Sequence, residues 1–286
     1  VVVADMRGEA RTGNLTPIGA DLSAALVETF ERGEQSILFL NRRGNSRQLL
    51  CGECGYVPEC PRCSVSLTYH SANRRLMCHY CNHSEQVSER CPECGGLMKQ
   101  IGAGTQKVEE ELHELFPEAS VLRMDADTTT GGHEAVLNRF EKEKIDILLG
   151  TQMVAKGLNL PDVTLVGVLD GDLSLYNDSY RSAETTFNML TQVVGRAGRG
   201  DTPGEALIQT VVPNHKVIEL AANQDYDGFY ELEIGLRMMQ QCPPFGDVTT
   251  VTLLGQDEAR VLHGAAKFRD SLIACLKEPV YQEEIC

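Results

Sequence analysis

Hydrophobic residues along the chain follow two alternating patterns. Short apolar runs, typical of strands buried on both faces, occur at 36–40, 120–124, 146–149, 163–169 and 205–212. Between them, apolar residues recur at helical spacing, at 21–33, 108–116, 134–143 and 182–197. Asp21 and Gly33 stand where the first of these helices would need an N-cap and a stop. Strands that alternate with helices are typical of a parallel sheet with crossover helices, so the pattern predicts an α/β fold.

The pattern breaks down between Cys51 and about Gln100, where turn-forming residues replace periodic apolar ones. It changes again beyond Pro213, where an amphipathic stretch leads to a predicted strand at 248–254 and a predicted helix at 258–276. We therefore expect four parts. They are the first part of the α/β layer (1–50), an insert (51–100), the second part of the layer (101–212) and the start of a C-terminal domain (213–286).

The charge of the chain argues against one class of function. Its 286 residues carry a formal charge of −15, and so acidic a protein does not coat nucleic acid by bulk attraction. The insert is the exception, because its five cations and five acids between Cys51 and Lys99 cancel. This stretch could approach phosphate without opposing it.

The sequence has no apolar run long enough to cross a bilayer, and we expect a cytoplasmic protein with no membrane partner. It begins with Val1 rather than Met and shows no signal peptide. We therefore expect a piece excised from a longer protein.

Eight of the eleven cysteines form four Cys-x-x-Cys pairs. The pairs are Cys51/Cys54, Cys60/Cys63, Cys78/Cys81 and Cys91/Cys94. Both thiolates of such a pair can bind one tetrahedral zinc ion, and two pairs complete a four-sulfur site, so the pattern predicts two Zn²⁺. A disulfide framework is the alternative, which the lack of a secretory segment disfavours, and iron–sulfur clusters use other spacings. Because the insert has few apolar residues to bury, the first role of the metal would be structural.

The spacing of the pairs favours a nested arrangement. Fourteen residues separate Cys63 from Cys78, which is about what a ribbon hairpin needs. The two inner pairs would share one zinc ion, and the two outer pairs would share the other at the neck of the insert. The inner site has Cys60, Cys63, Cys78 and Cys81, and the outer site has Cys51, Cys54, Cys91 and Cys94. In the sequential alternative, the first two pairs share a zinc ion, and the five residues between Cys54 and Cys60 must turn back on themselves.

Gln192, Arg196 and Arg199 form the most specific pattern outside the insert. Their spacing of i, i+4 and i+7 would put them on one face of a helix. Two guanidinium groups that project together suit the charge that builds up on a triphosphate during phosphoryl transfer. The simpler alternative is a solvated helix end with cations near its C-terminus.

The segment from Leu149 to Pro161 follows a predicted strand, at the edge of the sheet where ligand-binding loops lie. Together with Gln-x-x-Gly-Arg-x-x-Arg at 192–199, this Gly-Thr-Gln-Met-Val-Ala-Lys-Gly segment resembles motifs V and VI of superfamily 2 helicases. The resemblance implies that Gln192, Arg196 and Arg199 face ATP. It also implies nucleotide-coupling contacts from Gly150, Thr151, Gln152, Lys156, Gly157 and Gly195. Asn159 stands where many relatives have Asp, so their ribose contact is not carried over.

The position of the insert narrows the resemblance. A superfamily 2 second lobe interrupted after Phe39-Leu-Asn-Arg-Arg-Gly44 by four Cys-x-x-Cys pairs resembles the PriA family of bacterial primosomal helicases. Further stretches agree with this family, namely Gly102-Ala-Gly-Thr105, 125–129, Arg181-Ser-Ala-Glu184 and Arg237-Met-Met-Gln-Gln-Cys-Pro-Pro244. Gln106 departs from the Glu that is common there.

The family resemblance implies an ATP-dependent 3′ to 5′ DNA helicase that uses Mg²⁺ and acts in primosome assembly and the restart of stalled replication forks. The implied partners are single-stranded and forked DNA, single-strand-binding protein and primosome proteins. In this arrangement ATP would bind between a first lobe and the lobe that this chain forms.

Two motifs of a complete ATPase do not occur in the sequence. There is neither a Gly-x-x-x-x-Gly-Lys-[Ser/Thr] phosphate loop (Walker A) nor an Asp-Glu-x-His magnesium motif (Walker B). We therefore expect the isolated chain not to hydrolyse ATP. Asp170 and Asp172 follow a predicted strand and are expected to be turn or cap residues. The alternative functions are a non-motor adaptor that displays zinc ribbons to nucleic acid or protein, and another superfamily 2 translocase with a different zinc insert.

Overall fold

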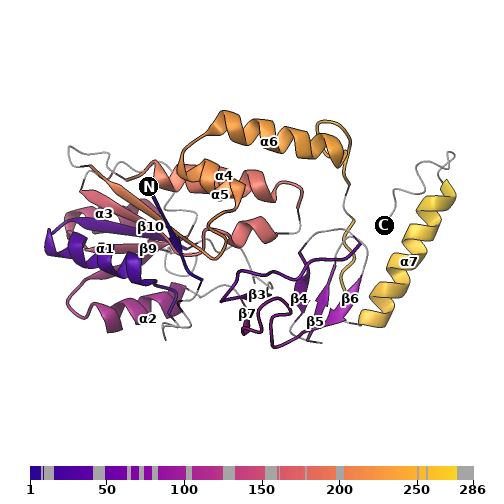
Figure 1. Ribbon diagram of the computed structural model, residues 1–286, viewed down its shortest axis with the longest axis horizontal. Coiled ribbons are helices and arrows are strands. Elements are labelled where there is room, and N and C mark those ends of the chain that lie inside the picture. Colours follow the sequence, from indigo (N-terminus) through magenta and orange to yellow (C-terminus); the bar gives the residue numbers. More distant parts are fainter. Residues whose placement is uncertain are drawn as a thin grey trace.

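The computed structural model describes residues 1–7, 9, 16–40, 49–62, 66–70, 74–78, 83–100, 105–124, 133–151, 160, 162–177, 179–197, 203–249, 251–255 and 257–275. Within these residues, a sheet of six strands has the order β1-β11-β10-β2-β9-β8, and all neighbouring strands are parallel (Figure 1). The strands are β1 (Val2–Asp5), β2 (Gln35–Phe39), β8 (Val121–Met124), β9 (Ile147–Gly150), β10 (Val163–Val168) and β11 (Glu205–Thr210). The predicted α/β fold with a parallel sheet is therefore confirmed.

Helices cover both faces of this sheet. As a result, every residue of the central strand β2 is buried. On one face, Leu38 packs in a core cluster with side chains of α1 (Ala20–Glu31) and α2 (Thr105–Leu115). On the other face, Ile37 and Phe39 pack with side chains of α3 (His133–Lys142), α4 (Ser182–Val194) and α5 (Lys216–Ala222). The alternation of Ile37, Leu38 and Phe39 across the strand divides the apolar core into these two layers.

The carboxyl ends of the central strands meet at one edge of the sheet. The backbone N–H of Leu40, after β2, donates to the carbonyl of Gly150 at the end of β9 at 2.8 Å. The N–H of Leu169, after β10, donates to the carbonyl of Phe39 at 3.0 Å. Strand β2 leads towards α2 on one face of the sheet, and its neighbour β10 leads to α4 on the other face, so the two connections diverge here. This is where open α/β sheets place ligand-binding loops.

The insert leaves and rejoins the sheet domain through an antiparallel pair, β3 (Leu49–Cys51) and β7 (Met98–Gln100). Beyond this neck lies a three-stranded antiparallel sheet of β4 (Thr68–His70), β5 (Arg75–Met77) and β6 (Ser84–Gln86). The insert has a small core of its own, and Figure 1 shows it beside the sheet domain.

Beyond β11, α5 is followed by α6 (Tyr226–Met239) and α7 (Glu258–Cys275). The ring of Phe229 in α6 stacks on that of Phe187 in α4, with centroids 4.1 Å apart and planes 8° from parallel. In the part of the chain that the structure describes, no helix is both long and apolar enough to span a membrane.

Several details differ from the sequence-based expectations. Strand β1 was not predicted, and it adds an edge strand to the sheet. Gly19, not Asp21, is at the N-cap of α1, and Asp21 lies in its first turn. The strand predicted at 248–254 is wrong, because the described residues of this segment pair with no other strand.

Candidate functional site

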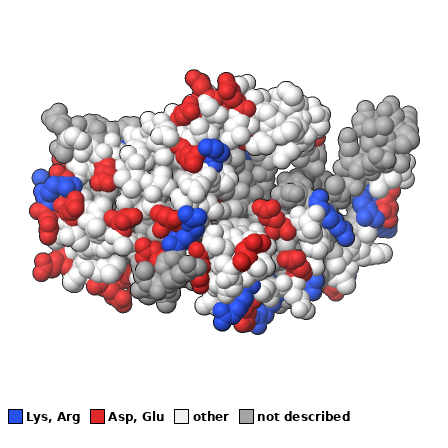
Figure 2. Space-filling view, viewed as in Figure 1, with Lys and Arg blue, Asp and Glu red and all other residues white. Residues whose placement is uncertain are grey.

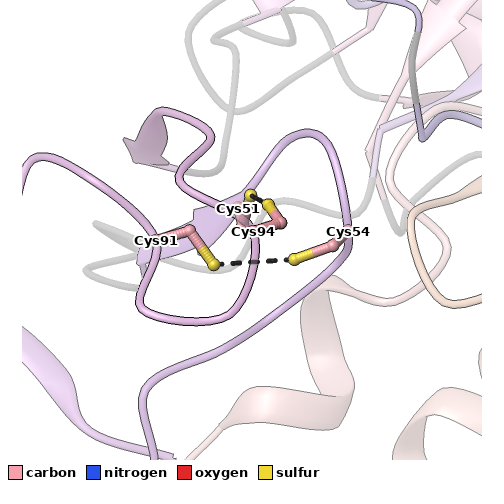
Figure 3. A group of neighbouring side chains, drawn as sticks. All are labelled: Cys51, Cys54, Cys91 and Cys94. Carbon is pink, nitrogen blue, oxygen red and sulfur yellow. Dashed lines mark hydrogen bonds between the residues drawn. The ribbon is translucent and has the colours of Figure 1, made fainter.

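Four cysteines meet at the neck of the insert, where β3 and β7 bring its two ends together. The Sγ atoms of Cys51, Cys54, Cys91 and Cys94 all lie within 4.8 Å of one another (Figure 3). The Cys51–Cys94 sulfur distance is 3.5 Å and the Cys54–Cys91 distance is 3.6 Å. Four sulfurs around a tetrahedral zinc ion at about 2.3 Å would lie about 3.8 Å apart. The spacing of these thiols therefore fits one zinc ion.

The local backbone explains why each pair presents its sulfurs together. The N–H groups of Cys51 and Cys91 donate to the carbonyl five residues on, each at 2.8 Å. Each pair is followed by a glycine with positive φ, 78° at Gly55 and 76° at Gly95. The N–H of Gly55 donates back to the carbonyl of Cys51 at 2.9 Å, and Gly95 makes the equivalent bond at 3.0 Å. A residue with a side chain would be strained in this left-handed conformation, so the Cys-x-x-Cys-Gly sequence itself forms the knuckle.

Burial opposes the ionisation of two thiols of the outer site, Cys51 and Cys54. Burial raises the pKa of Cys51, and it raises the pKa of Cys54 to about 12. For Cys91, burial works in the same direction, but N–H donors from Cys94 and Glu93 lower its pKa overall. Four sulfurs this close cannot all carry negative charge unless a cation lies among them, and a zinc ion supplies that charge.

The inner cysteines are described in part. Cys60 and Cys78 are buried together in the core of the insert, with Leu49, Leu67 and Leu76. The N–H of Cys78 donates to the carbonyl of His83, five residues on, at 2.8 Å, as in the two outer knuckles. Cys63 and Cys81 lie outside the described residues. The predicted inner site therefore stays a prediction.

The outer knuckle packs directly on the carboxyl edge of the sheet. A Cβ atom added at Gly55 would collide with the carbonyl oxygen of Val211, just beyond β11. The Nε of Arg7 binds Asp5, at the end of β1, at 2.8 Å. Hydrogen bonding to Asp5 raises the pKa of Arg7, and the nearby Cys54 adds to this effect. The metal site is thus built against the ends of strands β1 and β11.

The end of α4 differs from the prediction. The helix was expected to continue through Arg196, but it ends at Val194, with Gly195 as its C-cap. The N–H groups of Arg196 and Ala197 donate to carbonyls three residues back, at 3.0 and 3.2 Å, so the last turn tightens. The predicted helix end at Ala197 is therefore wrong, and Arg196 lies in a turn. The common face of Gln192, Arg196 and Arg199 stays a prediction, because Arg199 lies outside the described residues. Gln192 is exposed and Arg196 is partly buried.

The other predicted nucleotide-contact residues lie at the end of β9, in the turn after α4 or outside the described residues. Gly150 and Thr151 lie at the carboxyl end of β9. Helix α4 follows β10, and Gly195 and Arg196 lie in the turn at its end. Gln152, Lys156, Gly157 and Arg199 lie outside the described residues.

A buried acidic pair, expected from the sequence to be turn or cap residues, lies at the carboxyl end of β10. Asp172 precedes a 3-10 turn, η1 (Leu173–Tyr176), but its side chain does not cap it. The side chain of Thr210 and the N–H of Val211 bond to Asp172 instead. Within the described part of the chain, one carboxylate oxygen of Asp170 and one of Asp172 are buried without a hydrogen-bond partner.

Burial dominates the titration of these two side chains. It raises the pKa of Asp170 to about 7, and the charge of Asp172 raises it further. Burial also raises the pKa of Asp172 to about 6, against the hydrogen bonds to its carboxylate, which lower it. The sequence did not reveal this site, because the raised pKa values come from burial by the fold, and no local sequence pattern shows that burial.

Figure 2 shows how charge is distributed on one face of the molecule. Acidic side chains are spread over the sheet domain, while Lys and Arg are mixed with acids over the insert. This agrees with the balanced charge that the sequence shows between Cys51 and Lys99.

Two family models match the chain. The model of the helicase conserved C-terminal domain matches residues 98–201. The model of the PriA DNA helicase Cys-rich region domain matches residues 60–86, which include the four inner cysteines.

Known proteins resemble the chain over most of its length. The replication restart protein PriA of Bacillus subtilis is 48% identical over 277 residues, which cover 96% of this chain and 34% of that protein. The PriA protein of Synechocystis is 46% identical over 268 residues, which cover 91% of this chain and 32% of that protein. The chain therefore spans about a third of the length of the curated relatives it matches.

Solved structures are similar only at a distance. The C-terminal domain of the DEAD-box protein Dbp5 has a TM-score of 0.39 and 12% identity, covering 79% of this chain and 84% of that one. A TM-score this low indicates only a distant similarity between the two structures. The match to the PriA Cys-rich region, the match to the helicase C-terminal domain beside it and the identity to curated relatives agree, and the chain belongs to the PriA family.

Proposed function

We propose that this chain is the second motor lobe and zinc module of an ATP-dependent DNA helicase that restarts stalled replication forks. The observation that carries the proposal is the four-thiol cluster at the neck of an insert that directly precedes the residues matching the helicase C-terminal domain. An adaptor with a degenerate lobe would have no use for the arginines of the motif at 192–199. The proposal divides the chain into four parts. They are the first part of the motor lobe (1–50), the zinc insert (51–100), the second part of the lobe (101–212) and the start of a C-terminal domain (213–286).

In the proposed reaction, ATP binds between a first lobe and this one, and Mg²⁺ would balance the phosphate charge there. Gln192, Arg196 and Arg199 face the triphosphate, and the two arginines stabilise the charge that develops on the transferred group. The segment at 150–157 couples the nucleotide to the bound strand, with Gly195 in the turn that precedes Arg196. The motion would be 3′ to 5′ on single-stranded or forked DNA, with single-strand-binding protein and primosome proteins as partners.

The zinc module has a structural role first. Cys51, Cys54, Cys91 and Cys94 would hold one Zn²⁺ and clamp the two ends of the insert to the sheet domain, since β3 and β7 pair beside them. Cys60, Cys63, Cys78 and Cys81 would hold a second Zn²⁺ within the insert. The balanced charge of the insert leaves it free to contact DNA or a partner protein.

The test of the motor uses the full-length protein. Arg199→Ala should lower DNA-stimulated ATP hydrolysis by about 10³-fold or more, the range expected for an arginine finger. Arg139→Ala is a matched control, because Arg139 makes an exposed pair with Glu143 on α3. Unchanged turnover in Arg199→Ala would favour the adaptor. The isolated chain, which lacks both Walker motifs, should hydrolyse no ATP.

Metal analysis tests the zinc assignment. The purified chain should contain two zinc ions per molecule, and Cys54→Ser should reduce this number to one. Cys242→Ser, which lies outside the insert, should leave both. A chain with one zinc ion, or with zinc lost from neither site in Cys54→Ser, would contradict the assignment of two four-cysteine zinc sites.

A further inference from the structure

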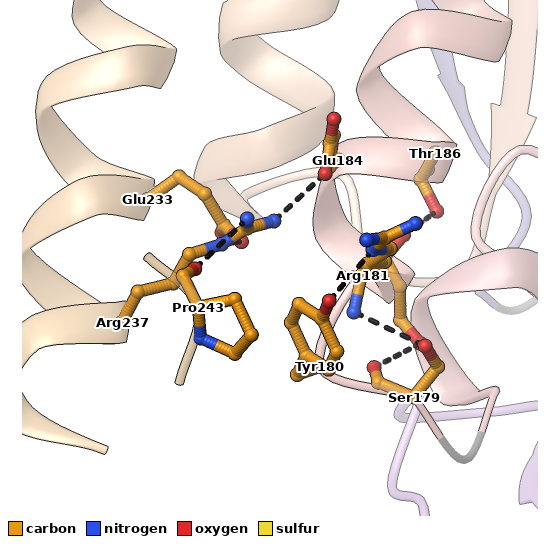
Figure 4. Close-up of polar contacts among 9 residues, drawn as sticks. Ser179, Tyr180, Arg181, Glu184, Thr186, Glu233, Arg237 and Pro243 are labelled. Carbon is orange, nitrogen blue, oxygen red and sulfur yellow. Dashed lines mark hydrogen bonds and ion pairs between the residues drawn. The ribbon is translucent and has the colours of Figure 1, made fainter. Parts of the chain in front are cut away.

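Two segments that agreed with the family in sequence but had no assigned role meet in the structure. One is 181–184, where α4 begins, and the other is 237–244, where α6 ends. Figure 4 shows the side chain of Arg237 reaching from α6 towards Glu184 on α4, beside the ring of Tyr180.

Arg237 is the centre of this contact. Its Nη2 binds the Glu184 carboxylate at 2.8 Å, and its Nε binds the Glu233 carboxylate at 2.8 Å. Its Nη1 donates to the carbonyl of Pro243 at 3.3 Å. The guanidinium carbon lies 5.2 Å from the centre of the Tyr180 ring. Every nitrogen of the guanidinium therefore has a partner.

The surroundings make the Arg237–Glu233 pair stronger than a surface pair, whereas Glu184 is 43% exposed. The side chains of Arg237 and Glu233 are 15% and 12% exposed, so water screens their charges little. Burial alone would lower the pKa of Arg237, but hydrogen bonds to Glu184 and Glu233 raise it overall. The guanidinium of Arg237 stays charged because the two carboxylates balance its charge.

Arg237 also ties together two parts of the chain with different expected roles. Helix α4 leads directly into Gly195 and Arg196, the residues expected at the nucleotide. Helix α6 belongs to the C-terminal segment. The stacked rings of Phe187 and Phe229 form a second, apolar contact between the same two helices. A displacement of α6 would therefore be transmitted to α4 and to the turn that holds Arg196.

We propose that Arg237 is a positioning residue for ATP turnover, which holds α4 and the Arg196 turn in place through Glu184 and couples them to the C-terminal segment. The proposal rests on the proposed function, since it assumes that Arg196 acts on ATP. Glu233 keeps the guanidinium in the orientation that reaches Glu184. The carbonyl of Pro243 fixes the chain beyond α6 to the same group.

The experiment uses the full-length protein with forked DNA and follows kcat and KM for ATP. Arg237→Gln should lower kcat about tenfold with KM changed less than twofold, because an interaction needed only in the transition state is displaced. Arg237→Lys should not restore the rate, because an ammonium group cannot bind both carboxylates in this geometry. Arg139→Gln, on an exposed pair in α3, should leave kcat unchanged.

A second variant keeps the test independent of folding. Glu184→Gln removes the ion pair between α4 and α6 but leaves the Arg237–Glu233 pair and the Phe187–Phe229 stack, so it should fold normally and lower kcat about threefold. Wild-type kcat in both Arg237→Gln and Glu184→Gln would overturn the positioning role. If Arg196→Ala also retains full ATPase activity, the proposed motor function fails as well. Loss in Arg196→Ala alone would leave the motor function standing and remove only the role of Arg237.

Discussion

The buried acids at the end of β10 should make the stability of the protein fall as pH rises. Asp170 has a pKa of about 7 in the folded chain because it is buried and lies near Asp172, against an ordinary value of 3.8. Between these two values the folded state binds a proton that the unfolded state has released. Stability is therefore greatest below about pH 4 as far as this group is concerned, and it is lost as pH rises towards 7.

The magnitude follows from the size of the shift. A difference of about three pH units at 1.4 kcal/mol each corresponds to about 4 kcal/mol, the upper limit of the penalty at pH 8. Asn cannot ionise and has nearly the same shape, so Asp170→Asn removes this penalty. The variant should be more stable than the natural chain at about pH 8, and the difference should shrink as the pH falls to about 5.

Urea unfolding of the zinc-loaded chain, followed by circular dichroism at several pH values, measures this difference. Asp227→Asn is the control, because Asp227 is exposed in the first turn of α6 and its loss should leave the pH dependence unchanged. Comparing variant and natural chain at each pH cancels the effect of acid on the zinc sites. An Asp170→Asn variant that is equally stable, or less stable, at pH 8 would refute the reasoning.

Three further predictions concern the knuckles and the core. Gly55→Ala should destabilise the chain more than Gly95→Ala. Both glycines have positive φ, but only a Cβ at Gly55 would collide with the backbone of Val211. Thermal unfolding of both variants measures the difference. Phe187→Ala should cost about 3–5 kcal/mol in urea unfolding, because Phe187 is 2% exposed and stacks in the core; a loss under about 1 kcal/mol would contradict that packing. Removal of zinc by a chelator should unfold the insert, and near-complete retention of its amide protection in hydrogen exchange would show that the insert does not depend on metal.

Much of the fold follows from local patterns in the sequence. Five strands of the sheet were predicted because each is a short apolar run, and each lies near its expected place, whereas the edge strand β1 was not predicted. The knuckles were predicted because Cys-x-x-Cys sets the position of two sulfurs within one turn, and the following glycines allow the required φ. These features depend on residues close together in the chain.

Tertiary structure decided the features that depend on distant residues. Pairing of β3 with β7 brings Cys51 and Cys54 to Cys91 and Cys94, whereas spacing alone left a sequential arrangement open. The segment at 248–254 has strand-like residues but forms no strand in its described part, because a strand needs a partner for its backbone hydrogen bonds.

The charged groups show the same division. Asp170 has the sequence context of a turn residue until the fold buries it, since desolvation depends on what surrounds the carboxylate and not on its neighbours in sequence. Arg237 and Glu184 are 53 residues apart, and only the packing of α6 on α4 brings them within 2.8 Å. Local sequence thus determined the elements and the metal-binding knuckles. The burial of charge and the contacts between helices were decided by tertiary packing, because both depend on distances that chain order does not specify.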